Sequence, residues 1–167
     1  MKFEKISFGQ WKKDIPFENV DDTTLLRWYE EIKMPKQGSK GSMGVDFFMP
    51  YKVVIKAHNK VKIPTGIRWC GGIINGESYG LLLVPRSSIG IKMGMRLLNT
   101  IGIVDYDYCF SNNEGHIIAF MENTTDKDVV LEKGQGFIQG IITSYIIPEC
   151  AKSDDIRDGG FGSTDNK

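Results

Sequence analysis

The sequence has few of the features that mark secreted or metal-binding proteins. Its three cysteines, Cys70, Cys109 and Cys150, are widely spaced and form no Cys-x-x-Cys pair, so neither a disulfide framework nor a zinc site is expected. The two histidines, His58 and His116, do not stand at metal-ligand spacing, and we expect ordinary surface or core residues there. We therefore expect three reduced thiols in a cytoplasmic protein.

Long apolar runs and an excess of either charge are also absent. No run approaches the length that spans a bilayer, and residues 1–14 lack the apolar core of a signal peptide. Basic and acidic residues balance at 21 each, which gives no electrostatic reason to expect a membrane surface or sequence-specific nucleic acid as partner. Any anionic ligand must therefore be held by a local group of side chains.

What the sequence does have is short β-type runs separated by glycine. Residues 52–57, 80–84, 116–121 and 140–147 are rich in Val, Ile, Leu and aromatic residues, and glycine occurs 19 times in 167 residues. This pattern predicts an all-β sandwich or barrel rather than a βαβ fold. One helix is expected over residues 23–32, capped by Asp22 and ended by Pro35, with an apolar face made of Leu25, Trp28, Tyr29 and Ile32.

The last segment, residues 151–167, is too polar to build a core of its own. It combines an arginine, three glycines, an aromatic ring and two hydroxyls, which suits a lid over a nucleotide phosphate chain. The ring could stack on a base. A disordered Gly/Ser-rich end is the alternative. The residues concerned are Arg157, Phe161, Ser163 and Thr164.

Three internal segments also carry polar side chains next to expected strands. In residues 84–92, Arg86 stands beside the hydroxyls of Ser87 and Ser88, which is suited to phosphate, although a polar turn would look the same. In residues 99–108, Asp105 could activate water or hold Mg²⁺, or could belong to a solvated acidic turn. In the third segment, Gln139 could point an amide at a ligand or lie on the surface.

Together these segments resemble the trimeric dUTPase family, whose five motifs occur here in order. The matches are residues 43–47 (MGVDF), 85–88 (PRSS), 102–108 (GIVDYDY), 133–139 (KGQGFIQ) and 159–164 (GGFGST), with Arg157 just before the last. The third and fifth motifs are the most specific. The fourth departs from the family, because Gln135 and Gly136 replace an Asp-Arg pair that forms an ion pair.

The resemblance implies a fold, a reaction and a set of roles. The fold would be a distorted jelly-roll β-barrel over residues 34–150, with an N-terminal extension over 1–33 and a mobile arm over 151–167 that closes over the site. The reaction would be hydrolysis of dUTP to dUMP and pyrophosphate by a homotrimer with shared active sites. Mg²⁺ would ride on the triphosphate with no direct protein ligand, and Asp46 would be structural or act indirectly on the metal.

The resemblance also assigns individual residues. Asp105 would activate the water that attacks the α-phosphorus, and Ser87 would donate to the oxygen bridging the α and β phosphates. Asn99 and Gly102 would read uracil, and Tyr108 would pack under the deoxyribose. Phe161 would close over the base. The phosphate chain would be held by Arg86, Gln139, Arg157, Ser163 and Thr164, with Ser88 and Lys92 as further substrate contacts.

Two other functions fit the same resemblance. A dCTP deaminase needs a glutamate three residues before an asparagine, but Phe120 stands three residues before Asn123. Glu122 is adjacent to that asparagine and should face the other way on a strand. The second alternative is a regulatory protein on a dUTPase scaffold, binding a protein partner through residues 2–32 or 109–114. For either enzyme we expect a cytoplasmic location, or the host cytoplasm if the gene is viral.

Overall fold

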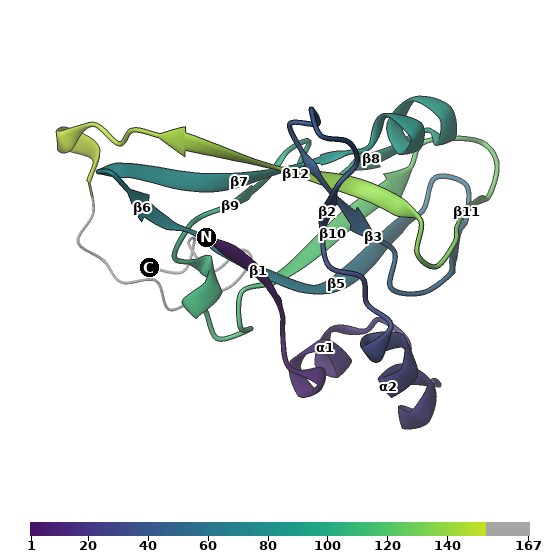
Figure 1. The fold of residues 1–167 in the computed structure, drawn as a ribbon. Coiled ribbons are helices and arrows are strands. Elements are labelled where there is room, and N and C mark those ends of the chain that lie inside the picture. Colours follow the sequence, from purple (N-terminus) through teal and green to yellow (C-terminus); the bar gives the residue numbers. More distant parts are fainter. Residues whose placement is uncertain (153–167) are drawn as a thin grey trace.

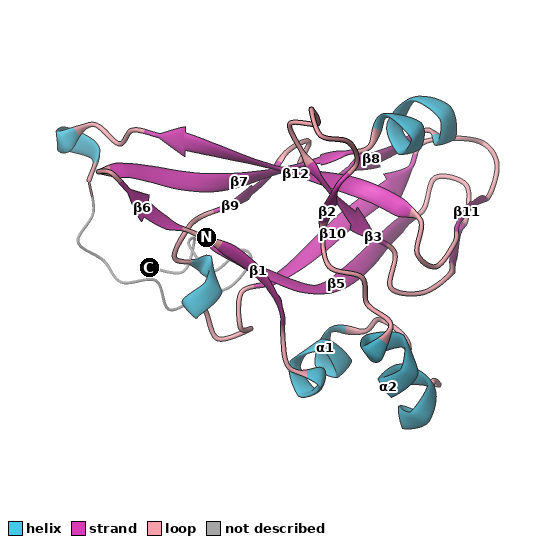
Figure 2. Cartoon of the chain, in the orientation of Figure 1, coloured by secondary structure: helices cyan, strands magenta, loops and turns pink. Residues whose placement is uncertain are grey.

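The computed structural model describes residues 1–152, and this part of the chain is built mainly of antiparallel strands in two facing sheets (Figure 1; Figure 2). The first sheet has the order β1-β5-β10-β8. Its strands are β1 (Lys2–Lys5), β5 (Lys60–Cys70), β10 (His116–Asn123) and β8 (Met95–Leu97).

The second sheet has the order β2-β3-β12-β7-β6, and β9 pairs with β7 as well. A separate two-stranded ribbon joins β11 and β4. The strands are β2 (Lys36–Gln37), β3 (Val45–Phe48), β12 (Gly136–Tyr145), β7 (Glu77–Pro85), β6 (Gly72–Ile74), β9 (Gly102–Val104), β11 (Val129–Leu131) and β4 (Val53–Ile55). Short helical turns are η1 (Ser88–Lys92), η2 (Tyr108–Phe110) and η3 (Glu149–Ala151).

The core lies between the two sheets. Phe3 of β1 meets Phe47 of β3 edge to face, with ring centroids 5.6 Å apart. Trp69 of β5, in the first sheet, and Phe137 of β12, in the second sheet, are both completely buried. All four predicted strand segments are found, and the all-β, jelly-roll prediction is confirmed. Among the described residues, however, hydrogen bonding leaves two sheets and a ribbon rather than one closed barrel.

Residues 1–33 pack against the sheets and add two helices, α1 (Phe8–Asp14) and α2 (Asp22–Glu30), which lie together beside β5 (Figure 1). The predicted helix is present, but its cap is Asp21, which accepts a hydrogen bond from the N–H of Thr24. The helix ends at Glu30, with Glu31 as its C-terminal cap. The expectation that Asp22 is the cap and that Pro35 ends the helix is therefore wrong.

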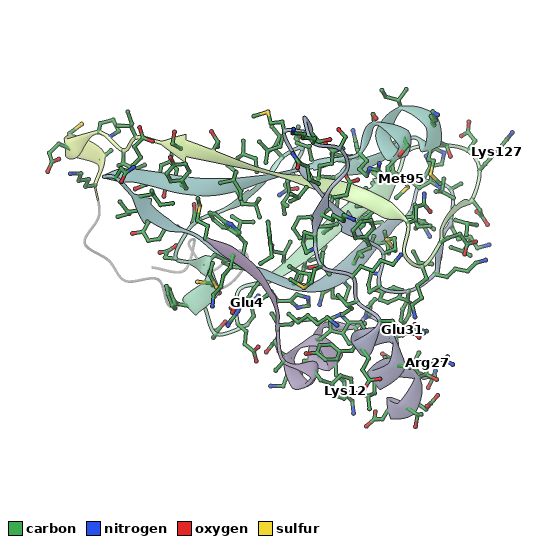
Figure 3. The ribbon with its side chains drawn as sticks, viewed as in Figure 1. Glu4, Lys12, Arg27, Glu31, Met95 and Lys127 are labelled. Atoms are coloured by element: carbon green, nitrogen blue, oxygen red, sulfur yellow. The ribbon has the colours of Figure 1, made fainter. Side chains whose placement is uncertain are left out.

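The amphipathic prediction is confirmed within α2, where Leu25 is buried and Trp28 and Tyr29 pack against the core. Ile32 is buried as well, but it lies beyond the end of the helix. On the exposed side of the helices, charged side chains such as Lys12 and Arg27 are directed to solvent (Figure 3). Helix α1 and strand β1 were not predicted, because seven and four residues are too short to show a clear period.

Two further expectations concern the cysteines and the membrane. Cys70, Cys109 and Cys150 are free thiols, with Cys109 buried and Cys150 exposed. Burial raises the pKa of the Cys109 thiol to about 11, and its contact with the Cys70 thiol adds to this shift. None of the helices within residues 1–152 is long and apolar enough to cross a membrane.

Candidate active site

Segments from four of the five motifs lie side by side in the second sheet. Gln139 of β12 stands opposite Asp46 of β3 on one side and opposite Val84 of β7 on the other. The next strand is β9, in which Gly102 stands opposite Leu83 of β7. Residues far apart in the sequence thus become neighbours across the order β3-β12-β7-β9, because antiparallel pairing places opposite residues on the same face.

Arg86 is held at the end of β7 by contacts from two neighbouring strands. Its Nε lies 3.1 Å from Oδ1 of the buried Asp46, and its Nη1 lies 3.5 Å from the carbonyl oxygen of Gly136. Its backbone N–H donates to the carbonyl of Phe137 at 3.0 Å. The guanidinium has five N–H donors, more than these side-chain contacts use, so it can be fixed in place and still bind an anion.

The fourth motif is completed differently from the family pattern. Gly136 lies directly against the guanidinium of Arg86, which occupies the space where a side chain would be. Gln135 caps the preceding turn, since its Oε1 accepts a hydrogen bond from the N–H of Glu132 at 2.9 Å. In place of the Asp-Arg pair, this chain therefore has an amide that caps the turn and a glycine that makes room for the Arg86 side chain.

A tight helical turn presents the hydroxyls of the second motif. Ser87 is exposed at the start of η1, and Ser88 is half-buried. The N–H groups of Ile89 and Gly90 both donate to the carbonyl of Arg86 at 2.9 Å, and the fully buried Ile89 anchors the turn. Lys92 ends the same turn with its side chain exposed.

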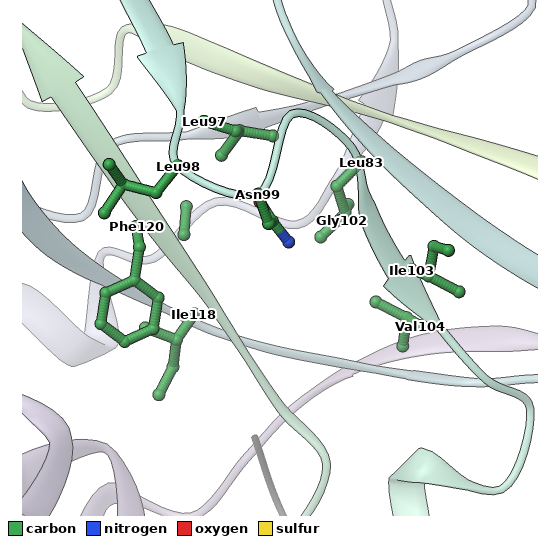
Figure 4. A pocket seen from close by; sticks show the side chains of 10 residues that line it. Leu83, Leu97, Leu98, Asn99, Gly102, Ile103, Val104, Ile118 and Phe120 are labelled. Atoms are coloured by element: carbon green, nitrogen blue, oxygen red, sulfur yellow. The ribbon is translucent and has the colours of Figure 1, made fainter. Parts of the chain in front are cut away.

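The third motif begins where the chain crosses from the first sheet to the second. Residues 98–101 join β8 to β9, and beside them opens an apolar cavity of about 430 Å³. Asn99 points into the space between Ile118 and Val104 (Figure 4). The cavity is lined by Leu83, Leu97, Leu98, Asn99, Gly102, Ile103, Val104, Ile118, Ala119 and Phe120.

Packing leaves little room for a side chain at position 102. A Cβ there would lie 3.1 Å from Cβ of Leu83 on the paired strand, which is tighter than ordinary contact. Gly102, which the resemblance assigns to reading uracil, also lines the cavity.

Tyr108 is 4% exposed, and its hydroxyl takes part in two hydrogen bonds. It donates to the carbonyl of His116 at 3.2 Å and accepts from Nδ2 of Asn113 at 2.8 Å. The loop 109–114 is therefore ordered around this ring. Asp105 is half-buried between the end of β9 and η2, with Asp107 nearby in the chain.

The structure does not bring all predicted site residues together within one chain. Continuing the β7–β9 register places Asp105 opposite Gly80, six residues before Arg86 on β7. At about 3.3 Å per strand residue, Asp105 and Arg86 are separated by roughly 20 Å along the sheet. We refer to Asp46, Arg86, Ser87, Ser88, Lys92 and Gln139, which lie on or directly after β3, β12 and β7, as the anion cluster, and to Asn99, Gly102, Asp105 and Tyr108, which lie within residues 99–108, as the base cluster.

Arg157, Phe161, Ser163 and Thr164 lie outside the described residues. Within residues 1–152 no group of three or more His, Cys, Asp or Glu side chains is placed to hold a metal ion. The sequence did not predict the contact between His116 and Asp14. These two residues lie 102 positions apart and belong to none of the five motifs.

The fold and these clusters define an all-β jelly-roll protein with one cluster suited to an anion and an apolar cavity beside the other. The family model described as dUTPase matches residues 30–165, and the chain belongs to the dUTPase family.

Curated relatives and a solved structure agree with this assignment. The deoxyuridine 5'-triphosphate nucleotidohydrolase of Lactococcus lactis subsp. lactis is 35% identical over 137 residues, covering 80% of this chain and 88% of the relative. That of Hydrogenobaculum sp. is 33% identical over 144 residues, covering 83% and 94%. The crystal structure of dUTPase from Streptococcus mutans is similar with a TM-score of 0.66 at 31% identity, covering 89% of this chain and 99% of that one.

Proposed function

We propose that this protein hydrolyses dUTP to dUMP and pyrophosphate by attack of water on the α-phosphorus. The observation that carries this proposal is the side-by-side placement of Asp46, Gln139, Arg86 and Gly102 in one sheet of a dUTPase-family chain. The positive charge of Arg86 can offset the negative charge of a phosphate chain, and the hydrogen-bond donors beside it can bind the phosphate oxygens. An apolar cavity beside the turn between β8 and β9 suits a flat base.

The anion cluster binds the phosphates in this proposal. The ion pair with Asp46 holds the guanidinium of Arg86 in one orientation before the ligand arrives. Arg86 therefore loses little rotamer freedom when it binds a phosphate. Ser87 donates to the oxygen that bridges the α and β phosphates, where charge develops as pyrophosphate leaves. Gln139, Ser88 and Lys92 supply further donors to the phosphate chain.

The base cluster selects the nucleoside. Asn99 and Gly102 border the cavity, and backbone groups of the turn between β8 and β9 read uracil there. Tyr108 packs under the deoxyribose and leaves no room for a 2′-hydroxyl. Asp105 accepts a proton from the attacking water, which makes it the general base.

The separation of the two clusters supports an active site shared between subunits. Roughly 20 Å between Asp105 and Arg86 is too far for both to reach one α-phosphorus in the same chain. We therefore propose a homotrimer in which one subunit supplies the anion cluster and its neighbour supplies the base cluster. The segment with Arg157, Phe161, Ser163 and Thr164 completes the site from the C-terminal end.

Mg²⁺ fits this site as a partner of the substrate. Asp46 is already ion-paired with Arg86, and the described residues contain no acidic cluster that could form a metal cage. Held by the triphosphate, the ion offsets phosphate charge when it is bound. We place the activity in the cytoplasm, which accords with three free thiols.

The side chains of β10 argue against the alternative function, a dCTP deaminase. Glu122 forms an ion pair with Arg96, Nη2 to Oε2 2.7 Å, and lies on the opposite side of the strand from the buried Asn123. Phe120, at the position of the required glutamate, lines the cavity with an apolar ring. A carboxylate directed at a cytosine base is therefore missing from this part of β10.

The deciding experiment measures pyrophosphate and ammonia from dUTP, UTP, dTTP and dCTP, each with Mg²⁺. We expect pyrophosphate from dUTP, far less from UTP because of Tyr108, and none from dTTP because the methyl group does not fit. Ammonia from dCTP would instead support the deaminase. Equal kcat/KM for dUTP and UTP would contradict the assigned role of Tyr108.

A further inference from the structure

His116 is completely buried, and both of its ring nitrogens are engaged. Nε2 accepts a hydrogen bond from the backbone N–H of Gly66 at 2.9 Å, and Nδ1 lies 2.6 Å from Oδ2 of Asp14. A backbone N–H can only donate, so Nε2 carries no proton and Nδ1–H donates to the carboxylate. The tautomer and the ring orientation are therefore set by α1 and β5.

This arrangement occurs at an irregularity in the first sheet. The pairing of β10 with β5 shifts register between His116 and Ile118. There the imidazole receives the N–H of Gly66, and the hydroxyl of Thr65 donates to the carbonyl of Ile117 at 2.7 Å. Side chains thus replace part of the regular backbone ladder, as at a β-bulge.

Helix α1 and the end of α2 pack closely over the same point. Gly66 has φ +74°, and a Cβ on it would lie 2.3 Å from Cδ1 of Ile32 and 3.2 Å from Cδ1 of Trp11. The indole of Trp11 donates to the carbonyl of Pro64 at 3.2 Å. Asp14 ends α1 and is further held by Nε2 of Gln10 at 3.0 Å.

The other side of His116 faces the base cluster. Its carbonyl accepts the hydroxyl of Tyr108, the residue assigned to the deoxyribose. A second connection joins Ser7 to the same loop, since its N–H and its hydroxyl both donate to the carboxylate of Glu114, the N–H at 2.8 Å. Two hydrogen-bonded links therefore run from the N-terminal segment to the loop that holds Tyr108.

We propose that Asp14 and His116 are positioning residues for Tyr108, and that the N-terminal segment thereby sets the preference for deoxyribose over ribose. This inference rests on the proposed dUTP hydrolysis and gives residues 1–33 a role within the site. The link acts through one carbonyl, so a small shift of β10 at His116 moves the phenol ring with it. Selection against a 2′-hydroxyl depends on such small displacements, because it works by steric exclusion.

The test compares kcat/KM for UTP and dUTP, together with thermal unfolding, in three variants. Asp14→Ala removes the acceptor of His116, and we expect the UTP-to-dUTP ratio to rise ~10-fold or more. Asp14→Asn keeps an acceptor oxygen and should return the ratio close to that of the wild type. Asp21→Ala is the matched control, because it removes the cap of α2 without touching His116. It should lower the unfolding temperature and leave the ratio unchanged.

A fourth variant guards against a misfolded Asp14→Ala protein. Glu114→Ala cuts the second link near the surface, and we expect a smaller rise in the same ratio. The positioning role is overturned by wild-type ratios in folded Asp14→Ala or in Glu114→Ala, or by an equal rise in Asp21→Ala. A wild-type protein that releases no pyrophosphate from dUTP would overturn the proposed function and this inference together. An active wild type with unchanged variants would overturn the positioning role alone.

Discussion

A Cβ atom on Gly136 would lie 2.5 Å from Nη1 of Arg86, closer than any ordinary contact. The absence of a side chain at position 136 therefore leaves room for the guanidinium beside β12, from where it reaches Asp46 on β3. The substitution in the fourth motif and the orientation of Arg86 are two aspects of one packing arrangement.

Gly136→Ala should accordingly displace Arg86. We expect a ~10-fold or larger fall in kcat/KM for dUTP, with a change of less than about 1 kcal/mol in the free energy of unfolding, because the atom that the new Cβ meets is the end of a flexible side chain. Gly41→Ala is the control, because a Cβ there meets nothing within 4 Å. Its unfolding free energy should change by less than about 1 kcal/mol. Urea denaturation and steady-state kinetics give both quantities, and wild-type kinetics in Gly136→Ala would contradict the role of Arg86.

Asp105→Asn should separate binding from chemistry. The amide keeps the shape of the side chain but cannot accept a proton from water, so turnover should fall ~10²-fold or more. Calorimetry should show that dUTP still binds. Asp107→Asn, two residues away, should lose less turnover. If Asp105→Asn turns over dUTP at a near-normal rate, the general base is another group.

Two inactive chains should restore each other if the site is shared. One carries Asp105→Asn, and the other ends at Asp154 and so lacks Arg157, Phe161, Ser163 and Thr164. Each alone should be nearly inactive. Assembled at random within trimers, about a quarter of sites would combine an intact Asp105 with an intact C-terminal segment. Verified mixed trimers without activity would mean that each chain completes its own site.

His116 should make the protein less stable below neutral pH. Burial lowers the pKa of His116, although Asp14 works in the opposite direction, so the unfolded chain takes up a proton first as pH falls. This contribution is present above about pH 6.5 and is lost as pH decreases toward the folded-state pKa. Lys62 and Glu114 are the other charged groups that act on the ring.

Urea denaturation between pH 7.5 and pH 5 checks this. We expect the unfolding free energy to fall over that range, and His116→Gln to flatten the slope because an amide can replace both hydrogen bonds without titrating. An unchanged slope in His116→Gln would contradict the assignment to His116.

The Asp14 carboxyl contributes to the pH dependence of stability at lower pH. Burial tends to raise the pKa of its carboxyl, but hydrogen bonds from His116 and Gln10 prevail and lower it to about 2. Its contribution is lost as pH falls from about 3.8 toward 2.

The sequence alone was enough for four of the strands, for the helical face of Leu25, Trp28 and Tyr29, and for the order of the five motifs. These features are local, because residue period, turn glycines and short motifs are written in neighbouring positions. The cap at Asp21 was missed by one residue, since two adjacent aspartates offer the same cap chemistry.

Only the tertiary structure decided which distant residues meet. The pairing of Asp46 with Arg86, the empty position at Gly136 and the contact of His116 with Asp14 all depend on strand register and on how α1 packs. The roughly 20 Å between Arg86 and Asp105 likewise follows from the antiparallel register of β7 and β9. Motifs determine which residues are present, but register and packing determine their distances, because chain separation carries no information about closeness in a folded sheet.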